Sequence, residues 1–152
     1  CHPAQQALYT GETGLPGASG DPDVMFEAEV ECTGCHDLSS ETSFAGMQEM
    51  CVECHETGYD EMLTEWATDI QEVLGKSLVG LDRARRLVAG PKQRGADVLE
   101  SEALLQQAES MIRLVEAGKG THNYPMSLEL LTAADEKLAS ALDRLGLMTG
   151  TP

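Results

Sequence analysis

Residues 32–55 read CTGCHDLSSETSFAGMQEMCVECH, and one five-residue pattern, C-x-x-C-H, stands at both ends of this stretch. In this pattern the two cysteine thiols bond covalently to the vinyl groups of a haem, and the adjacent histidine becomes an axial ligand of its iron. The sequence therefore predicts two covalently bound haem c groups. Their attachment residues and proximal iron ligands are Cys32, Cys35 and His36 in the first motif and Cys51, Cys54 and His55 in the second.

Two other uses of paired cysteines agree less well with this stretch. A structural zinc ion would be satisfied by the four thiolates alone, which leaves the histidine after each pair unexplained. A thioredoxin-like redox pair belongs in a βαβ unit, and the flanking sequence has no such pattern. Aromatic residues make up only 4% of the chain. Two haem macrocycles would supply the large apolar surfaces that these residues usually provide.

The histidine count matches the number of axial positions on two haems. The chain has four histidines, which are His2, His36, His55 and His122. Since the motifs use two of them as proximal ligands, the other two are predicted to be distal ligands. Bis-histidine ligation of this kind gives haems of lower potential than ligation by one histidine and one methionine. Met47, Met50 and Met62 are close enough in sequence to leave a His/Met haem, or a haem with an open position, as alternatives.

The pattern after the second motif predicts which haem each distal histidine serves. Apolar residues at helical spacing predict a helix from Tyr59 that ends at Gly90 and Pro91, and a second helix over residues 96–117. A chain that runs out and back in this way returns the loop around His122 to the second haem. His2 then falls to the first haem by elimination.

The sequence divides into a haem-binding segment, residues 1–58, and a helical part, residues 59–152. In the first part we predict an irregular loop over residues 3–23, a short strand over residues 24–30 and another loop over residues 37–50. A third helix is predicted from about Pro125 to Leu145. The expected fold is mainly α, with a loop-rich dihaem segment followed by an antiparallel three-helix bundle that carries a distal ligand.

Negative charge is concentrated in the haem-binding segment. The formal net charge of the chain is −16, and residues 1–58 contain 11 Asp or Glu and no Lys or Arg. This field repels nucleic acid and anionic lipid and attracts redox proteins with basic patches. The alternative is that the acidic residues serve only solubility. No apolar stretch reaches the length needed to cross a bilayer.

Cys1 is the fifth cysteine and has three possible explanations. It resembles the acylated cysteine of secreted bacterial lipoproteins, which would anchor the chain to a membrane through lipid alone. Alternatively, Cys1 and His2 end a truncated third C-x-x-C-H motif, which would add a third haem. A plain thiol or a disulfide to another chain is the remaining option. Since c-type haem is attached after export, we expect an extracytoplasmic location, in the periplasm or at the cell surface.

Three stretches together resemble a known family. They are the two haem motifs, the Glu56–Trp66 stretch ETGYDEMLTEW that enters the long helix, and the Gly120–Asn123 stretch GTHN. Over roughly residues 28–145 the chain is similar to the C-terminal part of multihaem c-type cytochromes from sulfate- and metal-reducing bacteria, which are related to octahaem tetrathionate reductase and hydroxylamine oxidoreductase. The resemblance implies that His36 and His55 are proximal ligands and that His122 is a distal one. Those proteins carry further haems upstream, whereas this chain has two motifs and no C-x-x-C-K motif.

These observations predict an electron-transfer protein: a carrier in a respiratory redox chain or a subunit of one. Its partners would be redox proteins, other multihaem cytochromes or a membrane complex. Two alternatives remain open at this point. One is a small reductase in which one iron lacks its sixth ligand, and the other is a structural or electron-relay subunit of a larger multihaem complex.

Overall fold

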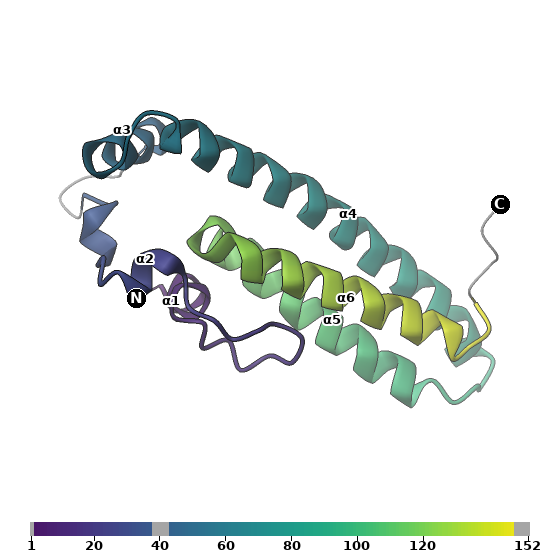
Figure 1. The fold of residues 1–152 in the computed structure, drawn as a ribbon. Coiled ribbons are helices and arrows are strands. Elements are labelled where there is room, and N and C mark those ends of the chain that lie inside the picture. Colours follow the sequence, from purple (N-terminus) through teal and green to yellow (C-terminus); the bar gives the residue numbers. More distant parts are fainter. Residues whose placement is uncertain (1, 38–42, 148–152) are drawn as a thin grey trace.

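The computed structural model describes residues 2–37 and 43–147. The prediction of a mainly α fold is confirmed, since the described residues form helices and contain no strand. Three long helices, α4 (Tyr59–Gln93), α5 (Leu99–Gly118) and α6 (Tyr124–Asp143), pack along one another (Figure 1). The short helices α1 (Pro3–Thr10), α2 (Val24–Glu27) and α3 (Phe44–Cys54) gather at one end of them, and α6 ends at the other end.

The core of the molecule lies between the three long helices. It consists of aliphatic side chains at helical spacing, with Met111, Ile112, Leu130 and Leu131 completely buried. Helix α4 has 35 residues and is about 52 Å long at 1.5 Å per residue. It continues to Gln93, beyond the end predicted at Gly90 and Pro91. Pro91 lies in the last turn, where its missing N–H costs only one helical hydrogen bond, and its side chain is buried.

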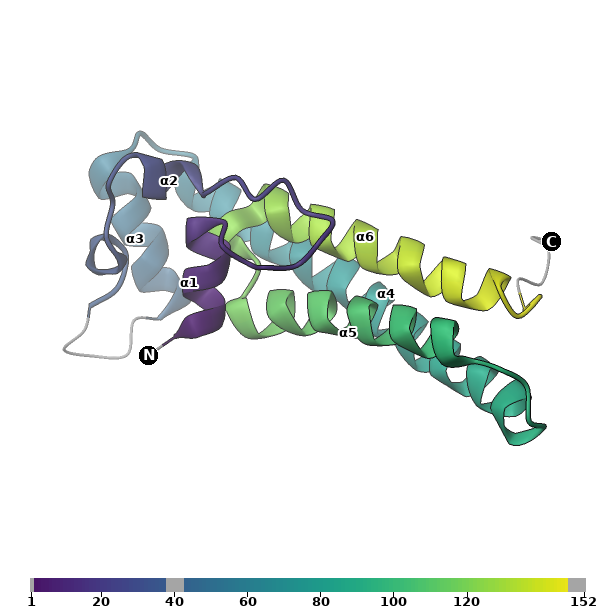
Figure 2. The same cartoon turned by 90° about the horizontal axis from the view of Figure 1, so that it is seen from below.

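The prediction of an irregular loop over residues 3–23 was wrong for its first part, which forms helix α1. Pro3 stands in the first turn, where its fixed φ suits a helix, and Gly11 ends the helix in the left-handed conformation. Leu8 is completely buried and holds α1 across the end of α5 (Figure 2). The close approach depends on Gly118, where an added Cβ would lie 2.5 Å from Leu8 Cδ1.

The strand predicted over residues 24–30 was also wrong. The Asp23 side chain accepts a hydrogen bond from the Met25 N–H and so caps the one-turn helix α2. The backbone then bonds to itself, with the Val30 N–H donating to the Met25 carbonyl. A strand needs a neighbouring strand to receive its backbone bonds, and the described part of the chain provides none.

Helix α3 occupies the second half of the predicted loop over residues 37–50. Ser43 accepts a hydrogen bond from the Gly46 N–H and starts the helix, which ends at Cys54 inside the second motif. Gln48 Nε2 donates to Thr64 Oγ1 and so ties α3 to the first turns of α4. The second motif is therefore carried on a helix that is fixed to the long helices.

Candidate haem-binding site

The first motif lies in a tight turn at the end of the segment that leads from α1. Cys32–Gly34 form the short 3-10 helix η1, and the His36 N–H donates to the Cys32 carbonyl. The preceding Val30 carbonyl accepts a hydrogen bond of 2.7 Å from the Tyr9 hydroxyl, so α1 holds the chain that enters the motif. Burial raises the pKa of Tyr9 to about 12, and the charges of Asp23 and the motif thiols add to the rise.

The second motif covers the last turn of α3 and the residue after it. Cys51 and Cys54 are three residues apart and therefore share one face of the helix. His55 is the C-cap residue, with extended backbone. Its ring stacks on Tyr59 at the start of α4, with ring centroids 4.2 Å apart and ring planes within 10°. The stacking holds the His55 ring against α4.

The two motifs lie next to each other although 14 residues lie between His36 and Cys51 in the sequence. Burial raises the pKa of the Cys35 thiol, and the nearby thiols of Cys51 and Cys54 raise it further. Burial also raises the pKa of Cys51. Any groups attached at the two motifs would therefore be neighbours.

His122 projects from the turn that joins α5 to α6. The turn contains the 3-10 helix η2 (Thr121–Asn123), and His122 Nδ1 lies 2.8 Å from the Gly118 carbonyl oxygen. Because a carbonyl only accepts, Nδ1 carries the proton and Nε2 is left with its lone pair free. Burial lowers the pKa of His122, which favours the neutral imidazole that binds metals. Histidines that bind a metal through one ring nitrogen commonly donate the other ring N–H to a backbone carbonyl in this way.

The structure brings the ring of His122 next to that of His36 in the first motif. The rings of His36 and His122 have centroids 6.1 Å apart and planes within 15° of parallel. The prediction that His122 serves the second haem is therefore not supported by this arrangement. Helix α1 lies across the returning end of α5, and the segment after it carries the first motif, a packing that the run of the long helices alone does not indicate.

The spacing of these two rings is compatible with two imidazoles that would hold one metal ion between them. An imidazole nitrogen binds a metal ion at about 2 Å and lies about 1.1 Å from its ring centre, so the centres of two such imidazoles would be about 6 Å apart. The observed centroid separation is 6.1 Å, and the rings are stacked nearly parallel. The residue types are also suitable, since two imidazoles and the pair of thiols in one motif are what a bis-histidine haem c would require.

His2 lies near the same site. It is the exposed N-cap residue of α1, and its charge, like that of His36, contributes to the lowered pKa of His122. Three of the four histidines of the chain thus gather around the first motif. The His55 ring stacks on Tyr59, and among the described residues it does not stack on another histidine.

Exposed apolar side chains also gather around the motifs. Of the seven large hydrophobic residues exposed in the described part of the chain, five lie between residues 24 and 59. They are Val24, Phe26, Phe44, Val52 and Tyr59. A haem presents two apolar faces, and side chains of this kind are suited to cover them.

The arrangement of the four motif thiols bears on the zinc alternative. Among the described residues, no three His, Cys, Asp or Glu side chains converge closely enough to hold a metal ion. A four-thiolate zinc site needs all four sulfurs around one ion. Haem attachment needs only one pair of thiols for each group.

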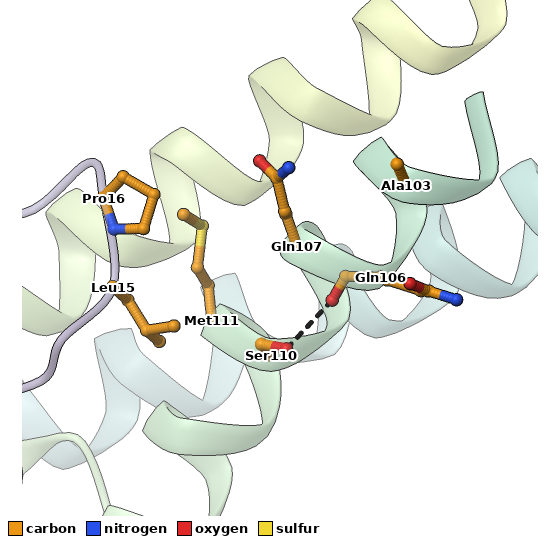
Figure 3. Close-up of a pocket in the computed structure, with 7 residues that line it drawn as sticks. All are labelled: Leu15, Pro16, Ala103, Gln106, Gln107, Ser110 and Met111. Atoms are coloured by element: carbon orange, nitrogen blue, oxygen red, sulfur yellow. Dashed lines mark hydrogen bonds between the residues drawn. The ribbon is translucent and has the colours of Figure 1, made fainter. Parts of the chain in front are cut away.

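The remaining candidates and the pockets add little to this site. Cys1 lies outside the described residues. Trp66 stacks on Tyr124, with ring centroids 5.2 Å apart. A shallow pocket lies between the loop after α1 and α5, and Figure 3 shows its lining residues. They are Leu15, Pro16, Ala103, Gln106, Gln107, Ser110 and Met111, which include no metal ligand other than a methionine.

Comparisons of the chain with protein-family models, with curated proteins and with solved structures found no match. No helix in the described ranges is both long and apolar enough to span a membrane. The interpretation of the site therefore depends on its motifs and its geometry.

Two residues that matter to the site were not singled out from the sequence. Gly118 contributes the carbonyl that orients His122, and a backbone contact of this kind has no sequence signal. Asn123 is the N-cap residue of α6 and is only 3% exposed. Asn directly before Tyr-Pro at a helix start is a capping signal, which could have identified this residue as structural.

Proposed function

We propose that this chain is a dihaem c-type cytochrome that transfers electrons. The observation that carries the proposal is the His36–His122 pair, whose rings lie 6.1 Å apart and nearly parallel, directly beside a C-x-x-C-H motif. The two residues are 86 positions apart in the sequence. They are brought together by the tertiary fold. Two haem c groups would supply one-electron redox chemistry, and the protein would set their potentials through ligation and burial.

At the first motif, Cys32 and Cys35 hold the haem, and His36 and His122 are the axial ligands. The Gly118 carbonyl fixes the tautomer and orientation of His122. With both axial positions taken by protein side chains, this iron has no place for a substrate. It is suited to electron transfer at low potential.

At the second motif, Cys51 and Cys54 hold the haem, and His55 is the proximal ligand. Tyr59 fixes the orientation of the His55 ring by stacking on it. The chain is then a dihaem segment of short helices joined to three long helices, with the turn between α5 and α6 contributing His122 to the first haem. His2 as a distal ligand of the second haem is the less favoured assignment, because His2 lies near His122.

The gathering of three histidines at the first motif favours a second candidate function. If His2 stays where it is, the second iron has one protein histidine and an open position for a small ligand. The chain would then be a small reductase. Spectra of the oxidised protein separate the two functions, because an all-low-spin protein has no open position, whereas a half high-spin protein that binds cyanide at one haem has one.

The mass of the holoprotein tests the number of haems. We expect the 16.3 kDa polypeptide to carry two haem masses, with any lipid as a further increment. Replacing both cysteines of one motif by alanine, at Cys32 and Cys35 or at Cys51 and Cys54, should remove one haem and leave the other. These two variants are matched controls for each other. Zinc without haem in the purified protein would refute the proposal.

The partners and the location follow from the charge and the motifs. The acidic haem end is suited to redox proteins with basic patches, including other multihaem cytochromes, either as a free carrier or as a relay subunit. Covalent haem attachment places the chain outside the cytoplasm, in the periplasm or at the cell surface. Mass spectrometry of the N-terminal peptide of native protein tests the lipid anchor, through an acyl increment on Cys1.

A further inference from the structure

We infer that Asn123 is the residue that positions His122 toward the first haem before the haem is bound. The inference rests on the proposed function, because it concerns the sixth ligand of that haem. Asn123 follows His122 directly in the chain, and its side chain is almost completely buried, with 3% of the residue exposed. It makes contacts with three separate segments of the molecule.

The hydrogen bonds of Asn123 use both ends of its amide group. Its Oδ1 accepts from the Met126 N–H at 3.1 Å and caps helix α6. Its Nδ2 donates to two carbonyl oxygens on the other side, those of Leu8 at 3.1 Å and Asp21 at 3.0 Å. The cap belongs to the long helices, whereas both carbonyls belong to the N-terminal segment that carries the first motif. Asn123 therefore joins the part that holds His122 to the part that holds His36.

The connection continues from these carbonyls to the motif itself. Next to Leu8, Tyr9 accepts through its carbonyl from the Asp23 N–H, and its hydroxyl donates to the Val30 carbonyl. Val30 stands two residues before Cys32. One step is a backbone hydrogen bond and the other is donated by the Tyr9 side chain, so the position of the motif depends on the position of Leu8 and Asp21. A displacement at Asn123 is thus transmitted to the distance between the His36 and His122 rings.

The turn around His122 is also held from the side of the long helices. Ser127 Oγ donates to the Gly120 carbonyl at 2.8 Å, and both atoms are buried. An added Cβ at Gly120 would lie 2.5 Å from Ile70 Cγ2, so α4 packs directly on this turn. Asn123 adds to the packing of Leu8 on Gly118 and to the hydrogen bond from Gln5 Nε2 to the Ala117 carbonyl, and it fixes the turn itself against α1. A ligand held in this way needs little rearrangement to bind the iron.

Two variants separate the helix cap from the two donated bonds. Asn123→Ser keeps a capping oxygen for the Met126 N–H but is too short to reach Leu8 and Asp21. Asn123→Asp keeps the size and the cap acceptor but has no donor for either carbonyl. Ser101→Ala is the control, because Ser101 is buried and its Oγ donates to the Ala141 carbonyl, so the variant also loses a buried hydrogen bond. Ser101 lies near the opposite end of α5.

The measurement is cyanide binding to the oxidised holoprotein, followed by haem absorption. It is repeated in the Cys51→Ala/Cys54→Ala background, where only the first haem is present. Cyanide must displace His122, so a less well positioned ligand is displaced more readily. Two lost hydrogen bonds of about 1 kcal/mol each predict cyanide affinity at the first haem at least about tenfold higher in both Asn123 variants. Ser101→Ala should stay within about twofold of wild type.

Cyanide affinities of the Asn123 variants that match those of Ser101→Ala would overturn the inference, since Asn123 would then be a structural residue only. Failure of the proposed function has a different signature, because the purified chain would carry no haem by mass. A variant that loads both haems and shows tighter cyanide binding with unchanged mass supports the positioning role.

Discussion

The exchange of His122 for alanine tests the pairing of the axial ligands most directly. In the polypeptide itself the change removes one hydrogen bond, from His122 Nδ1 to the Gly118 carbonyl. Such a bond contributes about 1 kcal/mol. For a chain of this size the loss lowers the melting temperature by roughly 2–4 °C. The variant should therefore fold, and its spectrum can be interpreted.

The spectroscopic effect should be large and confined to one haem. In the dihaem protein, His122→Ala should convert half of the haem signal to high spin. In the background without the second motif the conversion should be complete, and in the background without the first motif the substitution should have no effect. Added imidazole should restore the low-spin signal, because it replaces the missing ring at the same position. His2→Ala is the control and should leave the first haem low spin.

The reasoning fails if the change appears in the wrong haem. An effect only in the background that retains the second motif would return His122 to His55, as the sequence pattern predicted. An unchanged spectrum in every background would make His122 a residue of the turn, and a methionine would be the better candidate for the sixth ligand. Loss of low-spin signal in His2→Ala at the second haem would support bis-histidine ligation of both haems.

Three further predictions concern stability and partners. Leu8→Ala should cost about 2–5 kcal/mol, as should Leu130→Ala, but only the first should disturb the spectrum of the first haem, because Leu8 is the buried contact of α1. Burial raises the pKa of Asp23, so its ionised form costs stability at neutral pH and this cost disappears as the pH falls through the raised value. Asp23→Asn, which keeps the cap acceptor, should therefore melt higher than wild type at pH 7, with the difference closing near about pH 4 in thermal scans; equal melting temperatures at every pH would contradict this. Stopped-flow electron transfer with a cationic redox protein should slow as ionic strength rises past about 0.1 M, where the Debye length is about 10 Å, and should accelerate with an anionic one; two flat profiles would favour a buried relay subunit over a free carrier.

The long helices could be predicted from the sequence alone, whereas the haem chemistry of the two motifs stays a prediction. Apolar residues at helical spacing predicted α4, α5 and α6 closely, since this periodicity is local and recurs over many turns. C-x-x-C-H indicates haem through the kinds and spacing of its residues, which need no tertiary information. The N-terminal segment was predicted less well. Its helices are short, and each depends on one cap or one buried contact, such as Ser43 or Leu8.

Which histidine rings lie close together depends on tertiary contacts. Sequence reasoning placed His122 at the end of the molecule where the motifs lie, because an antiparallel pair of helices returns the chain there. It could not show that α1 crosses α5 at Gly118 and that Asn123 bonds to Leu8 and Asp21. These contacts join residues more than 100 positions apart in the sequence, and they depend on a missing side chain and on two backbone carbonyls. Neither leaves a periodic pattern in the sequence, and together they set His122 opposite His36.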